Sequence, residues 1–269
     1  MSKFKELQKI FIDRIEISQY IGLDTSILFY NKLQESIAKP LKMILLYGKP
    51  GTGKSILINK IYHDLKEKED IHIISTPIQN ESEFIKTLYR FLVGDAEEVP
   101  ENLTYTRFID ICNALKDEKH ITVLLDEAQL YPSQMMEQIR LISDTRVIKF
   151  VVSLHKTEKE DLIAKEHFQS RIWETIELKN GTVHDTQMYV QKKLIQQNYF
   201  EVASMFDKSN IKKIHRFTKG NYREINKMMY TLFEIYDYYE THRPSQIAHR
   251  TVKNKFIEMA ALKLGYIHA

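Results

Sequence analysis

A glycine-rich segment, GKPGTGKS from Gly48 to Ser55, constrains the fold of this chain more than any other feature. It follows a continuous apolar run, Met43 to Tyr47, which is typical of a strand buried on both faces. Apolar residues then recur at helical spacing from Ile56 to Leu65. The chain has only eight glycines, so three in this segment indicate a local structural requirement. The pattern predicts a strand, a tight loop and a helix.

The loop fits the pattern G-x-x-x-x-G-K-[ST], which binds phosphate groups. Glycines let the backbone N–H groups approach phosphate oxygens closely, and the following helix adds the positive end of its dipole. Lys54 would reach the β- and γ-phosphates, and Ser55 would offer its hydroxyl to Mg²⁺. The segment Pro50–Thr52 shapes the turn. These residues predict a site for a nucleoside triphosphate with Mg²⁺.

Two adjacent acids follow a second apolar run, Ile121 to Leu125. Ligands gather at the carboxyl ends of strands in open α/β sheets, which is where Asp126 and Glu127 are expected. Asp126 would order the water shell of the metal, and Glu127 would polarise the water that attacks the γ-phosphate. The pair therefore predicts hydrolysis in addition to binding.

Further apolar runs at 71–76, 147–154 and 175–178 are predicted strands, and 80–92 is a predicted helix capped by Asn80. Alternating strands and helices favour an α/β fold with a mostly parallel sheet covered on both faces. We expect a helical lead-in over residues 1–38, a nucleotide-binding core over 39–179 and an all-helical lid over 180–269. The polar segment 179–186 is the expected hinge.

The charge and the cysteine usage limit the function classes. The single cysteine, Cys112, excludes an intrachain disulfide and is expected to be a packed thiol. No signal peptide or membrane span is recognisable, so a cytoplasmic protein is expected. The net charge is only +3, but the segment 208–263 carries twelve Lys or Arg and five Asp or Glu.

Together these residues resemble the AAA+ ATPases over most of the chain. The resemblance implies a P-loop NTPase core followed by a small all-helical lid, with ATP and Mg²⁺ as cofactors. In TKGNYREINKMM, Arg223 takes the place of the second sensor, which reaches the nucleotide. The metal site would use Ser55 and Asp126. The implied nucleotide contacts are Ile21 and Gly22 against adenine, and Gly48, Pro50, Gly51, Thr52, Gly53, Lys54, Ser55, Ile56 and Arg223.

The motifs DEAQ, EQIRLIS and FQSRI resemble more specifically the branch with the ExeA and GspA general-secretion ATPases, pilus-associated relatives and transposition helpers. In that pattern Arg171 would be the arginine finger that serves a neighbouring subunit, with Arg140 as the alternative, so a homo-oligomer is implied. The first sensor departs from the family pattern. Ser153 and His155 stand where asparagine or glutamine is usual, and we favour His155.

Three functions are consistent with the sequence. The first is a Mg²⁺-dependent ATPase that powers a bacterial type II secretion, type IV pilus or DNA-uptake assembly, held at the inner membrane through a protein partner. The second is a DNA-binding ATPase of transposition or replication loading. The third is a nucleotide-gated scaffold with little turnover. DNA would be contacted by Lys212, Lys213, Arg216, Lys219, Arg243, Arg250, Lys253 and Lys255, and stacked on Tyr236, Tyr238 and Tyr239.

Overall fold

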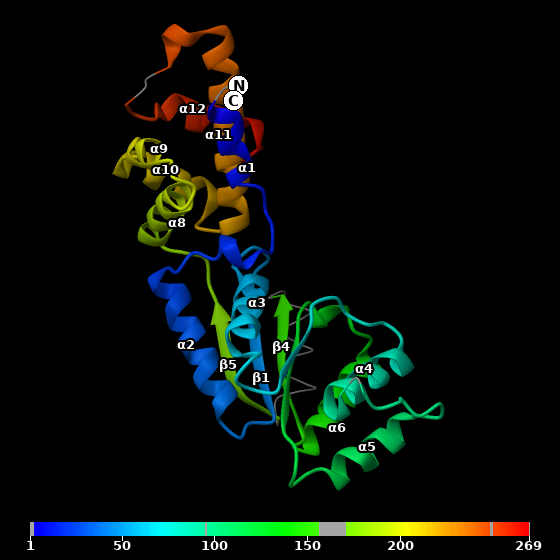
Figure 1. Ribbon diagram of the computed structural model, residues 1–269. Helices are drawn as coiled ribbons and strands as arrows, with labels where there is room; N and C mark the ends of the chain where they lie inside the picture. The colour runs from blue at the N-terminus through cyan, green and yellow to red at the C-terminus, as the bar shows by residue number, and fades with distance from the viewer. Residues whose placement is uncertain (1–2, 95, 156–170, 248–249, 269) are drawn as a thin grey trace. The chain divides into compact units, whose positions relative to one another are not determined.

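The computed structural model describes residues 3–94, 96–155, 171–247 and 250–268, which form two compact units. The sheet unit comprises Phe29–Lys49 and Lys54–Leu178. The helical unit comprises Met1–Leu28, Pro50–Gly53 and Lys179–Ala269 (Figure 1).

The sheet unit is built on five parallel strands in the order β2-β3-β4-β1-β5. All five predicted strands are present, as β1 (Met43–Gly48), β2 (Ile71–Ile74), β3 (Ile121–Leu125), β4 (Ile148–His155) and β5 (Ile172–Leu178). β5 begins three residues earlier than predicted, because its first residue already pairs with the first residue of β1. Parallel pairing places the carboxyl ends of β1, β3 and β4 at one edge of the sheet.

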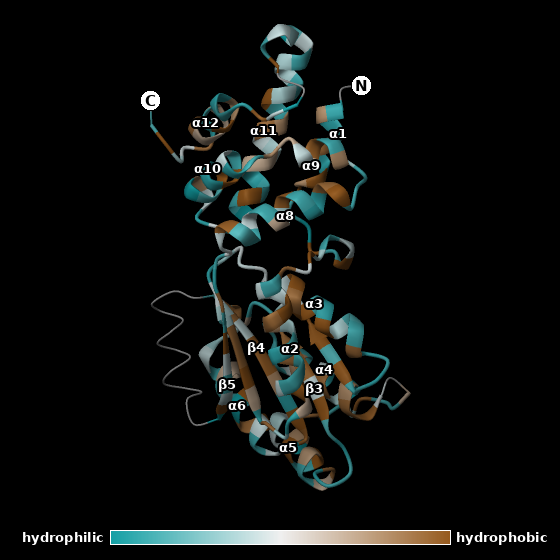
Figure 2. Ribbon diagram, turned by 90° about the vertical axis from the view of Figure 1, so that its left-hand side faces the viewer, coloured by the Kyte–Doolittle hydropathy of each residue, from teal (hydrophilic) through white to brown (hydrophobic). Residues whose placement is uncertain are grey.

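Helices cover both faces of this sheet, as predicted. Met43 and Leu45 of β1 point toward the face covered by α4 (Glu81–Val93), α5 (Tyr105–Ala114) and α6 (Ser133–Asp144). Ile44 and Leu46 point toward the face covered by α2 (Asp24–Ala38) and α3 (Lys54–Leu65). Hydrophobic residues accordingly run along the strands in Figure 2. A sheet buried on both sides explains why its strands are continuous apolar runs.

The helical unit has its own core. It contains α1 (Lys3–Ile10), α8 (Val183–Ile195), α9 (Phe200–Ser204), α10 (Lys208–Thr218), α11 (Tyr222–His242) and α12 (Asn254–Lys263). Short 3₁₀ turns are η1 (Ile17–Gln19), η2 (Ala128–Leu130) in the sheet unit, and η3 (Pro244–Gln246). Phe4 and Phe11 pack on Phe233 of α11. Leu33 and Ile37 instead join the sheet core. The expected 1–38 lead-in is therefore divided between the two units.

Capping side chains define several helix starts. Asn80 caps α4 by accepting a hydrogen bond of 2.9 Å from the Glu83 N–H, as the sequence predicts. Asn221 likewise caps α11. Thr182 and Asp185 form a reciprocal capping box that starts α8 at Val183. The second half of the predicted hinge, 183–186, is consequently helical.

Candidate nucleotide site

The phosphate-binding loop joins β1 to α3. Lys54, the first residue of α3, is 4% exposed, and its ammonium donates hydrogen bonds to the carbonyls of Gly48 (2.8 Å) and Lys49 (3.2 Å). Ser55 and Ile56 follow in the first turn of α3, where backbone N–H groups have no partner within the helix. The loop therefore presents a cation and helix N–H groups together, a combination suited to phosphate.

The tip of the loop, Pro50–Gly53, groups with the helical unit. The carbonyl of Pro50 accepts a hydrogen bond of 2.7 Å from the Asn221 side chain, and the carbonyl of Gly51 accepts one of 3.1 Å from the Tyr222 N–H. Gly51 has φ +80°, and a Cβ built there would lie 2.7 Å from the Cβ of Arg223. Only glycine fits this position, both for its backbone conformation and for its space.

Two residues predicted to serve one nucleotide, Gly51 and Arg223, are thus neighbours. The guanidinium of Arg223 donates through Nε to a carboxylate oxygen of Asp13 at 3.0 Å. Sequence reasoning did not single out Asp13, because an exposed acid in a leading segment carries no motif. Its side chain and that of Arg223 are both about half exposed, so the pair is weak and exchangeable.

The paired acids follow β3 at the carboxyl edge of the sheet, as predicted. Asp126 is 3% exposed, and one of its oxygens accepts a hydrogen bond of 3.0 Å from the Glu127 N–H. Glu127 has a left-handed backbone (φ 51°), unfavourable for a residue with a side chain. This left-handed residue follows the end of β3 and redirects the backbone, so that η2 (Ala128–Leu130) begins at the next residue.

Glu127, Gln129 and His155 form a hydrogen-bonded triangle. The Oε1 atom of Gln129 accepts from the His155 backbone N–H at 3.3 Å, which assigns the amide orientation because an N–H can only donate. The Gln129 NH₂ group then donates to Glu127 and to Nδ1 of His155, the latter at 3.2 Å. Nδ1 must accept, so the imidazole proton is on Nε2 and points at Glu127, 3.1 Å away. His155 is thereby a donor, through Nε2–H, to the predicted catalytic carboxylate.

The geometry separates the two candidates for the first sensor. His155 ends β4 directly opposite Gly48, the last residue of β1. Ser153 lies opposite Leu46, is fully buried, and its hydroxyl has no hydrogen-bond partner among the described residues. His155 therefore lies where the phosphate loop begins, whereas Ser153 is packed inside. The DEAQ motif contains Gln129 but does not reveal its role, which is to connect the segment after β3 to His155 at the end of β4.

Arg171 lies at the other end of the sheet. It immediately precedes β5, whose first residue pairs with Met43, whereas the phosphate loop follows Gly48. Six residues of strand separate these ends by roughly 20 Å. Arg171 is thus remote from the phosphate loop of its own chain. Phe168 to Ser170 of the FQSRI motif lie outside the described residues.

Both candidate arginine fingers contact Asp144. The Nη2 atom of Arg171 lies 3.0 Å from its carboxylate, the ammonium of Lys42 2.7 Å and Nη1 of Arg140 3.7 Å. Desolvation by itself would raise the pKa of Asp144, but the hydrogen bonds from Arg171 and Lys42 lower it below the ordinary value. Arg140 is additionally held by Glu137 and has only 14% of its side chain exposed. Arg171, at 31%, is the more accessible of the two.

Ile21 and Gly22 lie in the helical unit, and the carbonyl of Gly22 accepts a hydrogen bond of 2.6 Å from Lys192. A Cβ at residue 22 would meet only Ile27, at an ordinary contact distance of 3.7 Å. Among the described residues beyond its two chain neighbours, no other side chain or backbone atom lies within 4 Å of that Cβ position. The contact with adenine stays a prediction.

Ser55 and Asp126 are residue types that fit a Mg²⁺ site in which the nucleotide supplies some of the ligands. Ser55 and Asp126 offer hard oxygen ligands, and Mg²⁺ in such sites takes its remaining ligands from phosphates and water. No cluster of three or more His, Cys, Asp or Glu side chains that could hold a metal exists in the part of the chain that the structure describes. Cys112 is buried, and desolvation raises the pKa of its thiol to about 12, so it is an unreactive packed thiol as predicted.

The basic region of the helical unit is partly exposed and partly core. Tyr236 and Tyr239, predicted as stacking surfaces, are buried against Phe256, so that prediction is wrong. Their apolar neighbours on α11 bury the same face of the helix. Tyr238 is 52% exposed. Three predicted DNA contacts, Lys212, Arg216 and Lys219, are exposed on α10 and at its end. Lys208, at the start of α10, is exposed as well.

Comparisons with known proteins agree with this architecture. Residues 39–162 match a protein-family model described as an AAA domain. No curated protein matches the sequence. No helix among the described residues is long and apolar enough to cross a membrane.

Three solved structures share the fold at low sequence identity. The Walker-type ATPase PABY2304 of Pyrococcus abyssi is 15% identical, with a TM-score of 0.57 over 88% of this chain and 71% of that chain. Cdc6p from Pyrobaculum aerophilum is 14% identical, with a TM-score of 0.58 over 87% and 66%. The Orc1 protein of Aeropyrum pernix, solved in complex with DNA, is 14% identical, with a TM-score of 0.59 over 96% and 69%. The fold is that of the AAA+ ATPases, and none of the three is described as part of a secretion or pilus apparatus.

Proposed function

We propose that this protein is a Mg²⁺-dependent AAA+ ATPase that acts as an oligomer and couples ATP hydrolysis to binding of DNA. The AAA domain supports nucleotide binding. The observation that carries hydrolysis is the Glu127–Gln129–His155 triangle at the carboxyl edge of the sheet. The two donors fix the orientation of the Glu127 carboxylate, as a general base requires.

The loop would bind the triphosphate through its own polar groups. Lys54 exchanges its hydrogen bonds with the loop carbonyls for phosphate oxygens, which are stronger acceptors because they are charged. The backbone N–H groups at the start of α3 bind the same oxygens. Ser55 and Asp126 would hold Mg²⁺, which neutralises phosphate charge when bound.

Glu127 would orient and polarise the attacking water. His155 donates through Nε2–H and Gln129 through its amide, so the carboxylate is held in one orientation and remains an acceptor. As the water oxygen attacks the γ-phosphorus, the proton of the water passes to Glu127, and the bond from that phosphorus to the β-phosphate oxygen breaks, which releases ADP. Gln129 acts as a positioning residue, because it contacts both Glu127 and His155.

Arg171 would complete the site of a neighbouring subunit. Its position at the amino end of β5 keeps it away from the phosphates of its own chain. Arginines supplied to a phosphoryl-transfer site by a second subunit stabilise the transition-state charge. Within a single chain, the carboxylate of Asp144 binds the guanidinium of Arg171.

DNA is the proposed macromolecular partner because of α10. Lys208, Lys212 and Arg216 are spaced by four residues, so their side chains form one exposed stripe on a helix that contains no acidic residue. Such a stripe matches the phosphates of one DNA strand. The Aeropyrum pernix protein was solved with DNA bound, which favours this alternative over the secretion assembly.

Phosphate release by the wild type and by Glu127→Gln tests the enzymatic part. We expect Mg²⁺- and ATP-dependent release in the wild type and a loss of roughly 10²-fold or more in the variant, with ATP affinity retained, because only the group that polarises water is removed. Equal, negligible rates in both proteins would indicate a nucleotide-gated scaffold instead.

A titration of binding to duplex DNA against salt tests the partner. The affinity should fall steeply as salt rises, and Lys212→Ala combined with Arg216→Ala should flatten that slope by about two. Lys5→Ala, an exposed lysine on α1, is the matched control. No binding at low salt, or an unchanged slope in the double variant, would contradict the role of α10.

A further inference from the structure

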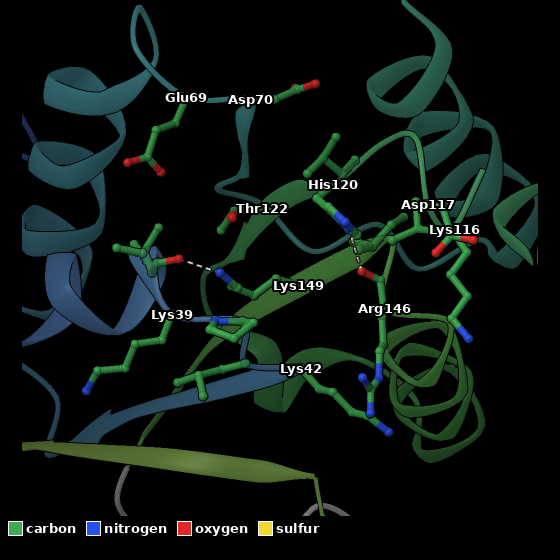
Figure 3. A pocket seen from close by; sticks show the side chains of 17 residues that line it. Lys39, Lys42, Glu69, Asp70, Lys116, Asp117, His120, Thr122, Arg146 and Lys149 are labelled. Carbon is green, nitrogen blue, oxygen red and sulfur yellow. Dashed lines mark hydrogen bonds between the residues drawn. The ribbon is translucent and has the colours of Figure 1, made fainter.

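A cavity of about 760 Å³ opens at the amino edge of the sheet, the end opposite the phosphate loop (Figure 3). Its walls come from four connections: 37–42 between α2 and β1, 69–70 leading into β2, 116–122 leading into β3, and 146–149 leading into β4. Lys42 lies just before β1, and the phosphate loop begins at the end of the same strand. Strand β1 therefore separates this cavity from the candidate nucleotide site.

Basic side chains outnumber acidic ones around the cavity. The lining Lys and Arg residues are Lys39, Lys42, Lys116, Arg146 and Lys149, and the lining acids are Glu69, Asp70 and Asp117. Figure 3 shows Glu69 and Asp70 on one side and Lys39, Lys42 and Arg146 on the other. Asp117 lies next to Lys116 at the right of the view, so the side with Lys39, Lys42 and Arg146 is the cationic one.

Several of these cations lack a protein partner. Within the described ranges, the side chains of Lys39, Lys116 and Arg146 make no hydrogen bond or ion pair. Lys42 is bound by Asp144, and Asp70 is bound by His72 at 2.8 Å. The unpaired charge that lines the cavity therefore includes three cations from separate segments of the chain.

Arg146 occupies a position that disfavours a side chain. It follows the end of α6 with φ 67°, the left-handed conformation that helix ends usually give to glycine. Its carbonyl accepts a hydrogen bond of 3.0 Å from Nδ1 of His120, which ties two walls of the cavity together. The chain thus places an arginine, at a conformational cost, beside the cavity.

Lys149 forms part of the cavity floor. Its ammonium donates to the carbonyl of Ile37, and burial lowers the pKa of this amine against an opposing effect of the Glu69 carboxylate. An anion beside this amine would offset the loss of hydration. Thr122, its neighbour in β3, contributes a hydroxyl to the same lining.

We propose that this cavity binds a small, multiply charged phosphate compound. Lysine ammonium groups and an arginine fork are the side chains that recognise phosphate oxygens. The volume is that of a small-molecule pocket, and acids on one wall would repel a long nucleic-acid backbone. The ligand is therefore a compact free anion that carries at least two phosphate groups, bound independently of the nucleotide loop.

Calorimetric titration of inorganic tripolyphosphate into full-length Lys54→Ala tests the proposal, because that substitution removes the lysine of the nucleotide loop. We expect one binding site. Adding Arg146→Gly should weaken binding at least tenfold, whereas adding Lys66→Ala, an exposed lysine outside the cavity, should not. Glycine suits the left-handed backbone, so Arg146→Gly should keep or raise the unfolding temperature.

Three results would overturn the proposal. Lys54→Ala could bind no tripolyphosphate, or Arg146→Gly could bind it unchanged. A single-stranded oligonucleotide could also bind more tightly than tripolyphosphate and lose that affinity in Arg146→Gly, which would make the cavity a nucleic-acid site. These titrations do not depend on ATP hydrolysis. If the wild-type protein hydrolyses no ATP, the proposed ATPase function fails while the cavity can still be tested.

Discussion

Individual residues of the phosphate loop tolerate little change, and Gly51 is the clearest case. Its φ of +80° is in the left-handed region, and its missing side chain leaves room for Asn221 and Arg223. Two separate costs, backbone strain and collision, therefore apply to any substitution. They can be distinguished by comparison with another glycine of positive φ.

Gly51→Ala should destabilise the protein by more than the roughly 1–2 kcal/mol of left-handed strain and should abolish tight ATP binding. Gly265→Ala is the matched control, because Gly265 has φ +73° and nothing within 4 Å of its would-be Cβ. Chemical denaturation and nucleotide titration measure both effects. Equal destabilisation of the two variants would show that the contact with Asn221 and Arg223 is unimportant.

Lys193 is a buried cation of the helical unit. It is 4% exposed and contacts the Tyr189 hydroxyl (3.3 Å), Oδ1 of Asn226 (3.2 Å) and the ring of Phe11. Desolvation lowers the pKa of its ammonium to about 8, against an opposing effect of Asp13. The unfolded chain therefore binds more protons than the folded one between pH 8 and the ordinary lysine pKa of 10.5.

Stability should accordingly rise with pH across that window, by on the order of 3 kcal/mol from this residue. Lys193→Met should be more stable than the wild type near pH 7 and should lose this rise. Urea denaturation of both proteins at pH 7 and pH 10 gives the comparison. A variant that keeps the full pH dependence would show that the ammonium is not the group responsible.

The residues that sequence could and could not predict differ in physical kind. Lys54, Ser55, Asp126 and Glu127 follow from local patterns, because a loop and a strand end fix their places. Gln129 could not be predicted, because its role depends on a hydrogen bond to β4 across the sheet. Burial of Tyr236 and Tyr239 was equally invisible to a charge count, since it depends on which face of α11 packs.

At the scale of elements, the start of α8 concentrates several hydrogen bonds. The Asp185 carboxylate accepts from the backbone N–H and the hydroxyl of Thr182, both at 2.8 Å, and from the Thr25 hydroxyl at 3.2 Å. The Thr182 hydroxyl oxygen accepts in turn from the Asp185 N–H at 3.1 Å. The box therefore joins α8 to the first turn of α2.

Thr182→Ala should lower the free energy of unfolding by about 1 kcal/mol, because a first-turn N–H of α8 loses its partner. Thr182→Ser keeps the hydroxyl and should lie near the wild type. Guanidinium denaturation followed by far-UV circular dichroism measures the difference. If serine destabilises as much as alanine, the methyl group rather than the cap is responsible.

The strands were the most predictable elements. Burial on both faces makes β1, β3 and most of β4 continuous apolar runs, and such runs are visible without any knowledge of pairing. The start of β5 was missed because Trp173 is 67% exposed and Glu174 is charged, as suits an edge strand. Its register comes from β1 rather than from its own composition.

For the whole molecule, Arg171 determines whether one chain suffices for catalysis. Its own phosphate loop lies at the opposite end of the sheet, so a role in hydrolysis requires a second copy. Lys54→Ala and Arg171→Ala would then remove different halves of a shared site. Each protein still carries the half that the other lacks.

Either variant alone should therefore be almost inactive, with Arg171→Ala slowed by roughly 10³-fold or more, and an equimolar mixture should recover a measurable fraction of wild-type phosphate release. Arg107→Ala, an exposed arginine of α5, should behave as the wild type. Sedimentation of the same mixtures reports whether the subunits associate. A mixture of associated subunits that stays inactive would contradict the shared site.

The backbone N–H of Tyr222 donates a hydrogen bond to the carbonyl of Gly51, so its exchange with solvent deuterium reports on the conformation of the phosphate loop. While that bond holds, the proton is shielded from exchange with solvent deuterium; if nucleotide remodels the loop tip, its labelling rate must change. The protein thereby carries an intrinsic, label-free reporter at the first residue of α11, readable in any complex it forms.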